Sequence, residues 1–379
     1  MCLGKRPGKD NMIRHIPEDV LWNIFICLPA KQVAQMRCVS KPWNAILSQP
    51  SFIKSHLDHH LTHDDEILLV FLYGEFSTRY PVTAHPARSP ILQLPNLIKL
   101  PKVDTSSSDK GYFIGSANGL ICFSSNQLGF RDPVIHIWNP SLSALAALYS
   151  IASTVDDTVD DNDHMWFRFG YDPINDDYKV VKVMFRLGGI HLDTIQGSVK
   201  VEVYSLKRGG CWQSVNGFPS ISFICNIDEV CVDGHLYWNC YVNAAWTQKT
   251  IVDFDLGAET FSEISIPDCI GHVVLGVLFQ KLCVMSCIYN SGCEVWLLVD
   301  HKWVRHHVFR QFGDWIDPIG FTSKNAFLFI TFDNRLALYN PDAAEVKLFT
   351  ANIQESDTKV VEYVESLVWP PSLRANMEN

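Results

Sequence analysis

Residues 16–57 read IPEDVLWNIFICLPAKQVAQMRCVSKPWNAILSQPSFIKSHL, with apolar side chains recurring at helical spacing. Pro17 suits a first helical turn, and the two acidic residues after it suit the positive end of a helix. Pro29 ends that first helix, Ser40 can cap a third helix, and Pro50 opens a fourth. So short a stretch makes a marginal core alone and usually buries its spare apolar surface against a partner. The sequence therefore predicts a small helical module that binds another protein.

The charge of the chain changes after this module. Residues 1–60 carry a net charge of +4 and residues 61–379 carry −14, which gives −10 for the whole chain. A chain with this balance is a poor candidate for holding a nucleic-acid backbone. Because 47% of the residues are hydrophobic and 19% are charged, a sizeable core is expected and wholesale disorder is excluded.

From about residue 66 the sequence shows β-strand patterns with a period. Alternating and β-branched runs are bounded by Gly, Asn, Asp and Pro. Hairpin turns predicted at Gly234, Lys281 and Asn325 follow one another at intervals of 47 and 44 residues. Repeats of this length with several strands each are typical of β-propeller blades. The sequence thus predicts a mainly β fold with a short helical start and a propeller of about six blades.

Three regions follow from these patterns. The helical module is expected over residues 12–60, a linker with the first strands over 61–103, and the β domain over 66–370. In closed propellers the first and last strands often share a blade, so the tail, residues 360–369, is predicted to pair beside residues 67–72.

The helical stretch resembles an F-box, the adaptor-binding motif of SCF-type ubiquitin ligases. The resemblance is carried by Ile16-Pro17-x-Asp19, Leu28-Pro29-x-Lys31, Arg37-Cys38-Val39-Ser40-Lys41-x-Trp43 and Pro50-x-Phe52. It implies binding to an SKP-type adaptor, and through it to a cullin scaffold, by Ile16, Pro17, Leu21, Ile24, Leu28, Pro29, Val33, Val39 and Trp43. Trp43 is also expected to pack the module together. Ala34 stands where Leu is usual, which implies a weaker adaptor affinity. The alternative is a helical cap without an adaptor.

Several strings of the β region resemble the F-box-associated domain that follows plant F-boxes. They include GSANGLICF near Gly119, IHIWNPS at Trp138, FGYDPINDDYKVVKV at Tyr171 and VDGHLYW at Trp238. Within that family the chain is most similar to the S-locus F-box and S-locus F-box-like group. The resemblance implies a receptor for a protein substrate, and the S-locus group implies a basic S-RNase as that substrate.

The sequence contains no nucleophile elbow, phosphate-binding loop or HExxH motif. We therefore expect a non-catalytic adaptor that needs no cofactor and no metal. One alternative is a propeller-fold enzyme acting on carbohydrate, which would need paired carboxylates at a central channel. Another is a non-degradative partner of the adaptor. Five tryptophans offer stacking surfaces but are expected in the core: Trp212, Trp238, Trp246, Trp303 and Trp315.

Polar clusters are interpreted as solvated surface. His56, His59, His60 and His63 share one helical face, where a metal site is conceivable, but a solvated helix end is predicted. Asp172, Asp176 and Asp177 are predicted to be solvated turn acids. The acidic insert is predicted to be a solvated loop, with steering of a basic partner as its functional alternative: Asp156, Asp157, Asp160, Asp161 and Asp163.

Twelve cysteines are scattered through the chain without a CxxC pair, which predicts buried, reduced thiols. No secretory signal and no apolar stretch long enough to span a bilayer is recognised. The expected location is therefore the cytoplasm, with the nucleus as the alternative, and neither a membrane nor a nucleic acid is expected as a partner.

Overall fold

The structure is a computed structural model. It describes residues 17–63, 66–76, 81–95, 97–98, 101, 111–125, 133–148, 163–188, 194–209, 211–243, 248–267, 272–288, 292–309, 316–352 and 358–369.

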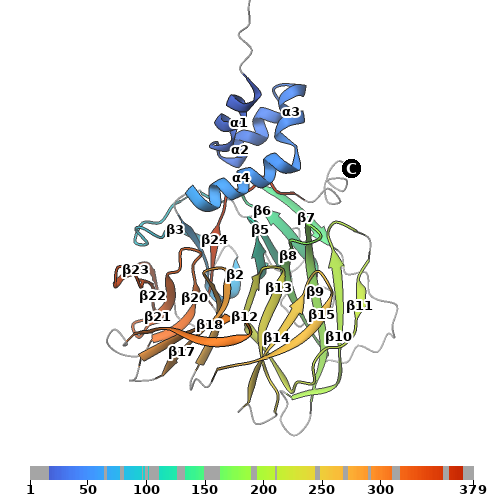
Figure 1. Ribbon diagram of the computed structural model, residues 1–379, viewed down its shortest axis with the longest axis vertical. Helices are drawn as coiled ribbons and strands as arrows, with labels where there is room; N and C mark the ends of the chain where they lie inside the picture. The colour runs from blue at the N-terminus through green and yellow to red at the C-terminus, as the bar shows by residue number, and fades with distance from the viewer. Residues whose placement is uncertain are drawn as a thin grey trace, which may run out of the picture.

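Four helices form the N-terminal module, which projects from the rim of the β domain (Figure 1). They are α1 (Glu18–Ile26), α2 (Ala30–Arg37), α3 (Lys41–Leu47) and α4 (Pro50–His63). As predicted, Pro17 and Pro29 stand at the N-caps of α1 and α2, and the Ser40 hydroxyl accepts the N–H of Trp43 at the start of α3. The helices pack around Phe25, Val33, Leu47 and Phe52, all of which are buried.

Among the described residues, 24 strands form six antiparallel sheets around a ring (Figure 1). One sheet contains β24 (Lys359–Tyr363), β1 (Ile67–Phe71) and β3 (Thr83–Pro86). The next contains β2 (Glu75–Phe76), β4 (Gly111–Ala117), β5 (Leu120–Ser124), β6 (Ile135–Asn139) and β7 (Ala144–Leu148); a 3-10 turn, η1 (Leu72–Gly74), precedes β2.

The remaining four sheets have four strands each. The first contains β8 (Asp163–Asp172), β9 (Asp177–Gly188), β10 (Thr194–Ser205) and β11 (Gln213–Val215). The second contains β12 (Phe223–Val232), β13 (His235–Tyr241), β14 (Lys249–Asp255) and β15 (Thr260–Ser265). The third contains β16 (His272–Leu278), β17 (Lys281–Ile288), β18 (Gly292–Val299) and β19 (Lys302–Phe309). The fourth contains β20 (Ile316–Phe321), β21 (Phe327–Thr331), β22 (Arg335–Asn340) and β23 (Glu345–Asn352). The prediction of a six-bladed propeller is confirmed.

The ring closes where the predicted tail segment meets the first strand. β24 pairs antiparallel with β1, with Tyr363 opposite Ile67 and Lys359 opposite Phe71. One blade is therefore built from both ends of the β domain. Strands of neighbouring blades contact one another in the order β4, β8, β12, β16, β20 and β24.

The strand β1 is buried on both faces, which explains its uninterrupted apolar run. Leu68 and Val70 pack against the blade of β20–β23, while Leu69 and Phe71 pack against the blade of β4–β7. Alternate residues of a strand point to opposite faces, so a strand between two neighbours needs apolar residues at every position.

Short turns join the first two strands of several blades. Asn118 and Gly119 (φ 51° and 79°) turn β4 into β5, and Asp233 and Gly234 (φ 51° and 82°) turn β12 into β13, as predicted. The turn predicted at Gln280-Lys281 begins one residue earlier, because Phe279 and Gln280 adopt the positive φ angles and Lys281 is already the first residue of β17.

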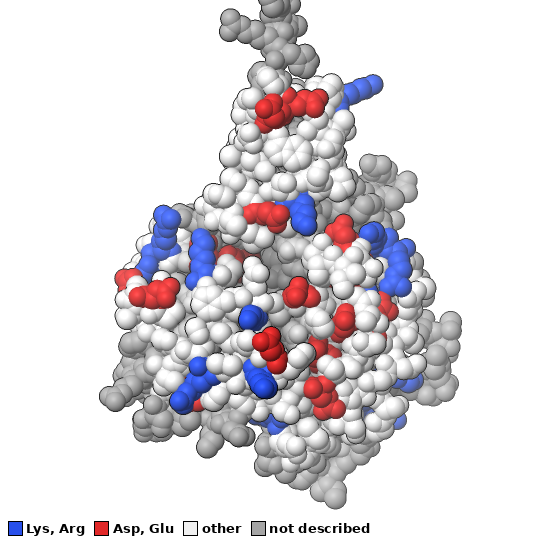
Figure 2. Space-filling model, in the orientation of Figure 1, with Lys and Arg blue, Asp and Glu red and all other residues white. Residues whose placement is uncertain are grey.

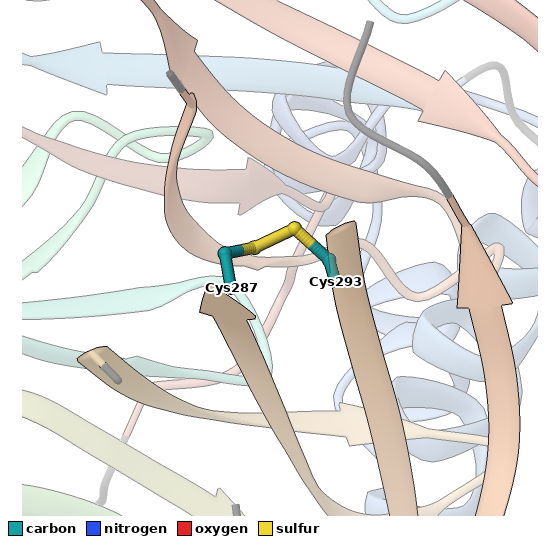
Figure 3. Close-up of a disulfide and its surroundings, with 2 residues drawn as sticks. All are labelled: Cys287 and Cys293. Carbon is teal, nitrogen blue, oxygen red and sulfur yellow. A yellow bond between two sulfur atoms is a disulfide. The ribbon is translucent and has the colours of Figure 1, made fainter. Parts of the chain in front are cut away.

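The cysteine prediction is correct for Cys122, Cys240 and Cys283, which are buried thiols. It is wrong for Cys27, Cys38 and Cys211, whose thiols are exposed. It is also wrong for Cys287 and Cys293, which form a disulfide between β17 and β18 (Figure 3). These residues lie directly opposite each other in the strand pair, with their Cα atoms 4.0 Å apart. The register of this strand pair brings the two sulfur atoms together. The spacing of the two cysteines in the sequence did not predict this pairing. No helix in the described ranges is long and apolar enough to cross a membrane.

A buried histidine in β6 gives a testable pH dependence. The His136 ring stacks on Phe123 at 4.9 Å, and neither of its nitrogens has a hydrogen-bond partner among the described residues. Burial lowers the pKa of His136 from 6.5 to about 4. Because the unfolded chain takes up this proton more readily, stability is retained above pH 6.5 and lost as the pH falls from there towards 4.

We expect His136→Phe to raise the free energy of unfolding by about 1–2 kcal/mol at neutral pH, since it removes an unsatisfied buried polar group. The gain should be larger at pH 5, where protonation penalises the wild-type protein. Urea midpoints at pH 7.5 and pH 5 would measure both effects. The exposed His306, replaced by Phe, is the control; an equal gain there, or a gain that does not grow on acidification, would contradict the prediction.

Candidate functional site

The helical module exposes several apolar side chains. Val20, Ile24 and Val39 are 42%, 49% and 62% exposed, and Pro17 and Pro29 are exposed as well. Val20 and Ile24 lie one turn apart on the same face of α1. Other apolar side chains already fill the interior of the module, so these exposed side chains are not part of its core. These side chains therefore form a surface available to a partner.

The other predicted adaptor contacts lie deeper or outside the described residues. Leu21, Leu28 and Trp43 are half-buried and pack against the module's core, where the Trp43 ring meets that of Phe25 at 5.2 Å. Val33 is fully buried and offers no contact surface in this structure. Ile16 lies outside the described residues.

The chain segment after β24 attaches the helical module to the propeller. Leu367, which is fully buried, belongs to the apolar core of the module, and Leu142 from the β6–β7 turn packs against the same core. The Ala30 N–H donates to Glu365 Oε2 at 2.9 Å. Since α2 has no side-chain cap from its own segment, this carboxylate occupies the positive end of the helix. A residue 335 positions away thus caps α2.

The segment itself is held on the β6–β7 turn. The Asn139 side-chain amide donates to the carbonyl oxygens of Ser366 and Val368, at 3.0 and 2.9 Å. The Ser366 N–H donates to the Ser141 hydroxyl at 3.1 Å. These bonds fix the position of Leu367, and therefore the orientation of the module on the ring.

The histidine row on α4 is only partly solvated. His56 and His60 are buried, with rings 4.3 Å apart, while His63 is exposed. The prediction of a solvated helix end is therefore wrong for the first two, because α4 packs against the rest of the module. His56 Nε2 lies 2.8 Å from the Leu28 carbonyl oxygen, and burial lowers the pKa of His56 to about 4. No group of three or more metal-binding side chains occurs among the described residues.

A cavity of about 360 Å³ opens where α4 meets the propeller. Its walls come from the β4–β5, β8–β9 and β12–β13 turns, the end of β24, and Leu61 of α4. Polar groups reach it from Ser116, Asn118, Tyr171, Asp233 and Glu362. Concave sites with a few convergent polar groups are where proteins usually bind ligands, so this pocket is the candidate site of the β domain.

Comparison with known protein families agrees with this architecture. Residues 13–55 match the F-box domain, and residues 68–360 match the F-box associated beta propeller domain. The chain belongs to the F-box proteins with an associated propeller. Similar proteins include "F-box/kelch-repeat protein At3g23880" from Arabidopsis thaliana, 23% identical over 95% of this chain and 97% of that protein.

Two further relatives from Arabidopsis thaliana have lower coverage. "F-box protein CPR1" is 26% identical over 76% of this chain and 70% of its own length. "F-box protein DOR" is 27% identical over 79% of this chain and 75% of its own length. The helical module is therefore an F-box, and α4 joins it to the propeller of this plant-type F-box protein.

The centre of the propeller holds an ion pair. Arg168 Nε of β8 lies 2.8 Å from Glu229 Oε2 of β12. Burial raises the pKa of Glu229 to about 7, while the positive charges of Arg168 and Lys359 act in the opposite direction. Among the described residues, Glu229 is thus paired with an arginine of the neighbouring blade.

Three acids of this F-box protein were predicted to lie solvated in a turn, and two of them are buried instead. Asp172 and Asp177 are buried. Asp172 Oδ1 accepts the backbone N–H groups of Ile174 and Asn175, and its carboxylate lies 3.4 Å from Lys179 Nζ. Asp177 accepts hydrogen bonds from the Ser205 hydroxyl and the Lys207 N–H. The prediction failed because these partners lie outside the turn, and the local turn signal does not show them.

The tryptophans and the acidic insert complete the predicted features. The core prediction is confirmed for Trp238, which is fully buried. Trp212 and Trp303 are half-buried and pack against the outside of apolar clusters. Trp246 and Trp315 lie outside the described residues, as do Asp156, Asp157, Asp160 and Asp161 of the insert; of Asp163, the structure describes only the backbone, at the start of β8.

Proposed function

We propose that this F-box protein is the substrate-recognition subunit of an SCF-type cullin ubiquitin ligase. The observation that carries the proposal is the exposed apolar set Pro17, Val20, Ile24, Pro29 and Val39 on a module whose interior is already filled. Apolar side chains at such a surface are suited to docking against the helices of an SKP-type adaptor. The half-buried Leu21 and Leu28 border this set and extend it.

The propeller would hold a protein target, and the cullin scaffold would bring the ubiquitin-conjugating enzyme close to it. In this scheme the chain contributes proximity and orientation and makes no bond itself. The hydrogen-bonded junction at Asn139 and Glu365 supports such a role, because it fixes the propeller relative to the F-box. Degradation of the target would follow in the cytoplasm, with the nucleus as the alternative location.

A basic protein is the target class we propose. Residues 61–379 carry a net charge of −14, which speeds encounter with a positively charged partner at physiological salt. The sequence resemblance to the S-locus group makes a basic S-RNase the specific candidate to test.

The test is reconstitution of the full chain with an SKP-type adaptor and a cullin. We expect a stoichiometric complex that stays intact through gel filtration and that ubiquitinates a basic S-RNase when the conjugating enzymes are added. A complex that contains the adaptor but never the cullin would favour the non-degradative alternative. A chain that binds neither would contradict the proposal.

A further inference from the structure

The pocket between α4 and the propeller turns is lined by acidic side chains but not by basic ones. Its sixteen lining residues include two carboxylates, Asp233 and Glu362, and no Lys, Arg or His. Asp233 stands at the exposed tip of the β12–β13 turn, whereas Glu362 is half-buried on β24. The carboxylates therefore approach the cavity from two different blades.

Carboxylates outside the lining also act on the cavity wall, although Asp172 among them is paired with Lys179. The Tyr171 hydroxyl donates to Asp176 Oδ1 at 2.8 Å, and the negative charges of Asp176, Asp172 and Asp58, after burial, raise the pKa of Tyr171. Asp58 belongs to α4, so the F-box side of the cavity contributes as well.

A buried acid stands close to the β24 wall. Glu66 is 7% exposed, and its Oε1 has no hydrogen-bond partner in the described part of the chain. Burial raises the pKa of both Glu66 and Glu362. At Glu362 the hydrogen bond donated by the Ser323 hydroxyl, at 2.7 Å, and the charge of Lys324 oppose this shift, while the charge of Glu66 adds to it. A cation that enters the cavity would therefore favour the charged forms of these acids.

The remaining wall is apolar and aromatic. It is lined by Leu61, Pro140, Pro173, Tyr363 and Val364. Long cationic side chains bury their methylene stems on such surfaces and place the charged end beside carboxylates or over aromatic rings. A neutral ligand could offer the carboxylates only the weaker hydrogen bonds of an uncharged donor, and an acidic ligand would be repelled by them.

We propose that this pocket receives an arginine or lysine side chain from a segment of the protein target. The inference rests on the proposed function and refines it, because it assigns the place and the chemistry of target recognition. The bound segment would lie against Leu61 of α4, beside the F-box. Figure 2 shows acidic and basic side chains scattered together over the visible face, so we place the selectivity for a cation in this cavity.

The experiment measures peptide binding to the full chain co-purified with an SKP-type adaptor. The probe is a fluorescein-labelled, end-blocked heptapeptide with one arginine between two leucines, and its partner peptide carries citrulline, which has nearly the same shape without the charge. Fluorescence anisotropy gives both dissociation constants. We expect the arginine peptide to bind about tenfold more tightly, as befits a charge-assisted hydrogen bond in a partly buried site.

The variants Asp233→Asn and Glu362→Gln keep the shape of each side chain and remove its charge. Together they should abolish the preference for arginine, while Asp342→Asn, on an exposed turn outside the pocket, should leave it intact. Equal binding of the two peptides, or no binding of either, would overturn the pocket assignment. So would an equal loss in the Asp342 variant.

Adaptor co-purification is scored separately in every preparation. If the adaptor binds but the arginine preference is absent, the pocket inference fails and the receptor proposal stands. If the arginine preference is present in the isolated chain but the adaptor never binds, the ligase proposal fails and the chemistry of the pocket stands.

Discussion

Replacing Val20, Ile24 and Val39 by Asp is expected to abolish co-purification with an SKP-type adaptor while the propeller remains folded. These side chains are 42%, 49% and 62% exposed, so the changes leave the interior of the F-box intact. Buried at an interface, each apolar anchor typically contributes about 2 kcal/mol or more, and loss of two or more weakens binding by roughly a thousandfold. Pull-down and calorimetry of the triple variant would measure the loss.

Two controls separate binding from folding. Ile174 and Phe279 are exposed on propeller turns, and their replacement by Asp should leave adaptor binding unchanged. Leu21 and Leu28 pack partly into the F-box core, so their change to Ala should lower both adaptor affinity and the stability of the module. Undiminished binding of the triple Asp variant would show that the adaptor uses another surface.

Ending the chain at residue 357 is expected to prevent stable folding of the propeller. The truncation removes β24, the partner of β1, and with it the closure of the ring. It also removes Leu367 from the F-box core and Glu365 from the start of α2. The combined loss should exceed about 5 kcal/mol, which is the whole stability of many domains. Urea unfolding and limited proteolysis would measure the effect.

A chain that ends at Trp369 is the matched control, because it keeps every described contact of this segment, and it should unfold like the full chain. Leu367→Ala leaves β24 in place and should cost about 2–5 kcal/mol through a cavity in the F-box core. A cooperative, wild-type-like transition in the chain ending at residue 357 would show that the other five blades fold without closure.

Sequence patterns that span only a few residues were sufficient to predict the helices and the turns. The prolines and Ser40 predicted where the helices begin, since caps act on the adjacent turn. Turn residues at intervals in the forties predicted the blades, and the one-residue error at Gln280 arose because Phe279 accepts a positive φ angle. The pairing of β24 with β1 was predicted from the need to close a ring rather than from any local signal.

The adaptor surface and the pocket were harder to predict from the sequence. The family pattern predicted Pro17, Ile24, Val33 and Val39 as adaptor contacts; the structure exposes the first two and Val39, whereas the burial of Val33 depends on how four helices meet. Nothing local to Asp233 or Glu362 marks them as neighbours, since they are brought to one cavity by blades far apart in the chain.

The amino-acid sequence by itself determined the helical F-box, the six-bladed ring and the contrast in charge between them, because periodicity, caps and composition are properties of short segments. Only the tertiary structure decided that His56, His60 and Asp172 are buried, that Cys287 faces Cys293, and that Glu365 caps a helix 335 positions away. Burial and pairing of this kind depend on which distant surfaces pack together, and a side chain's environment is then set by residues that its own sequence neighbourhood does not contain.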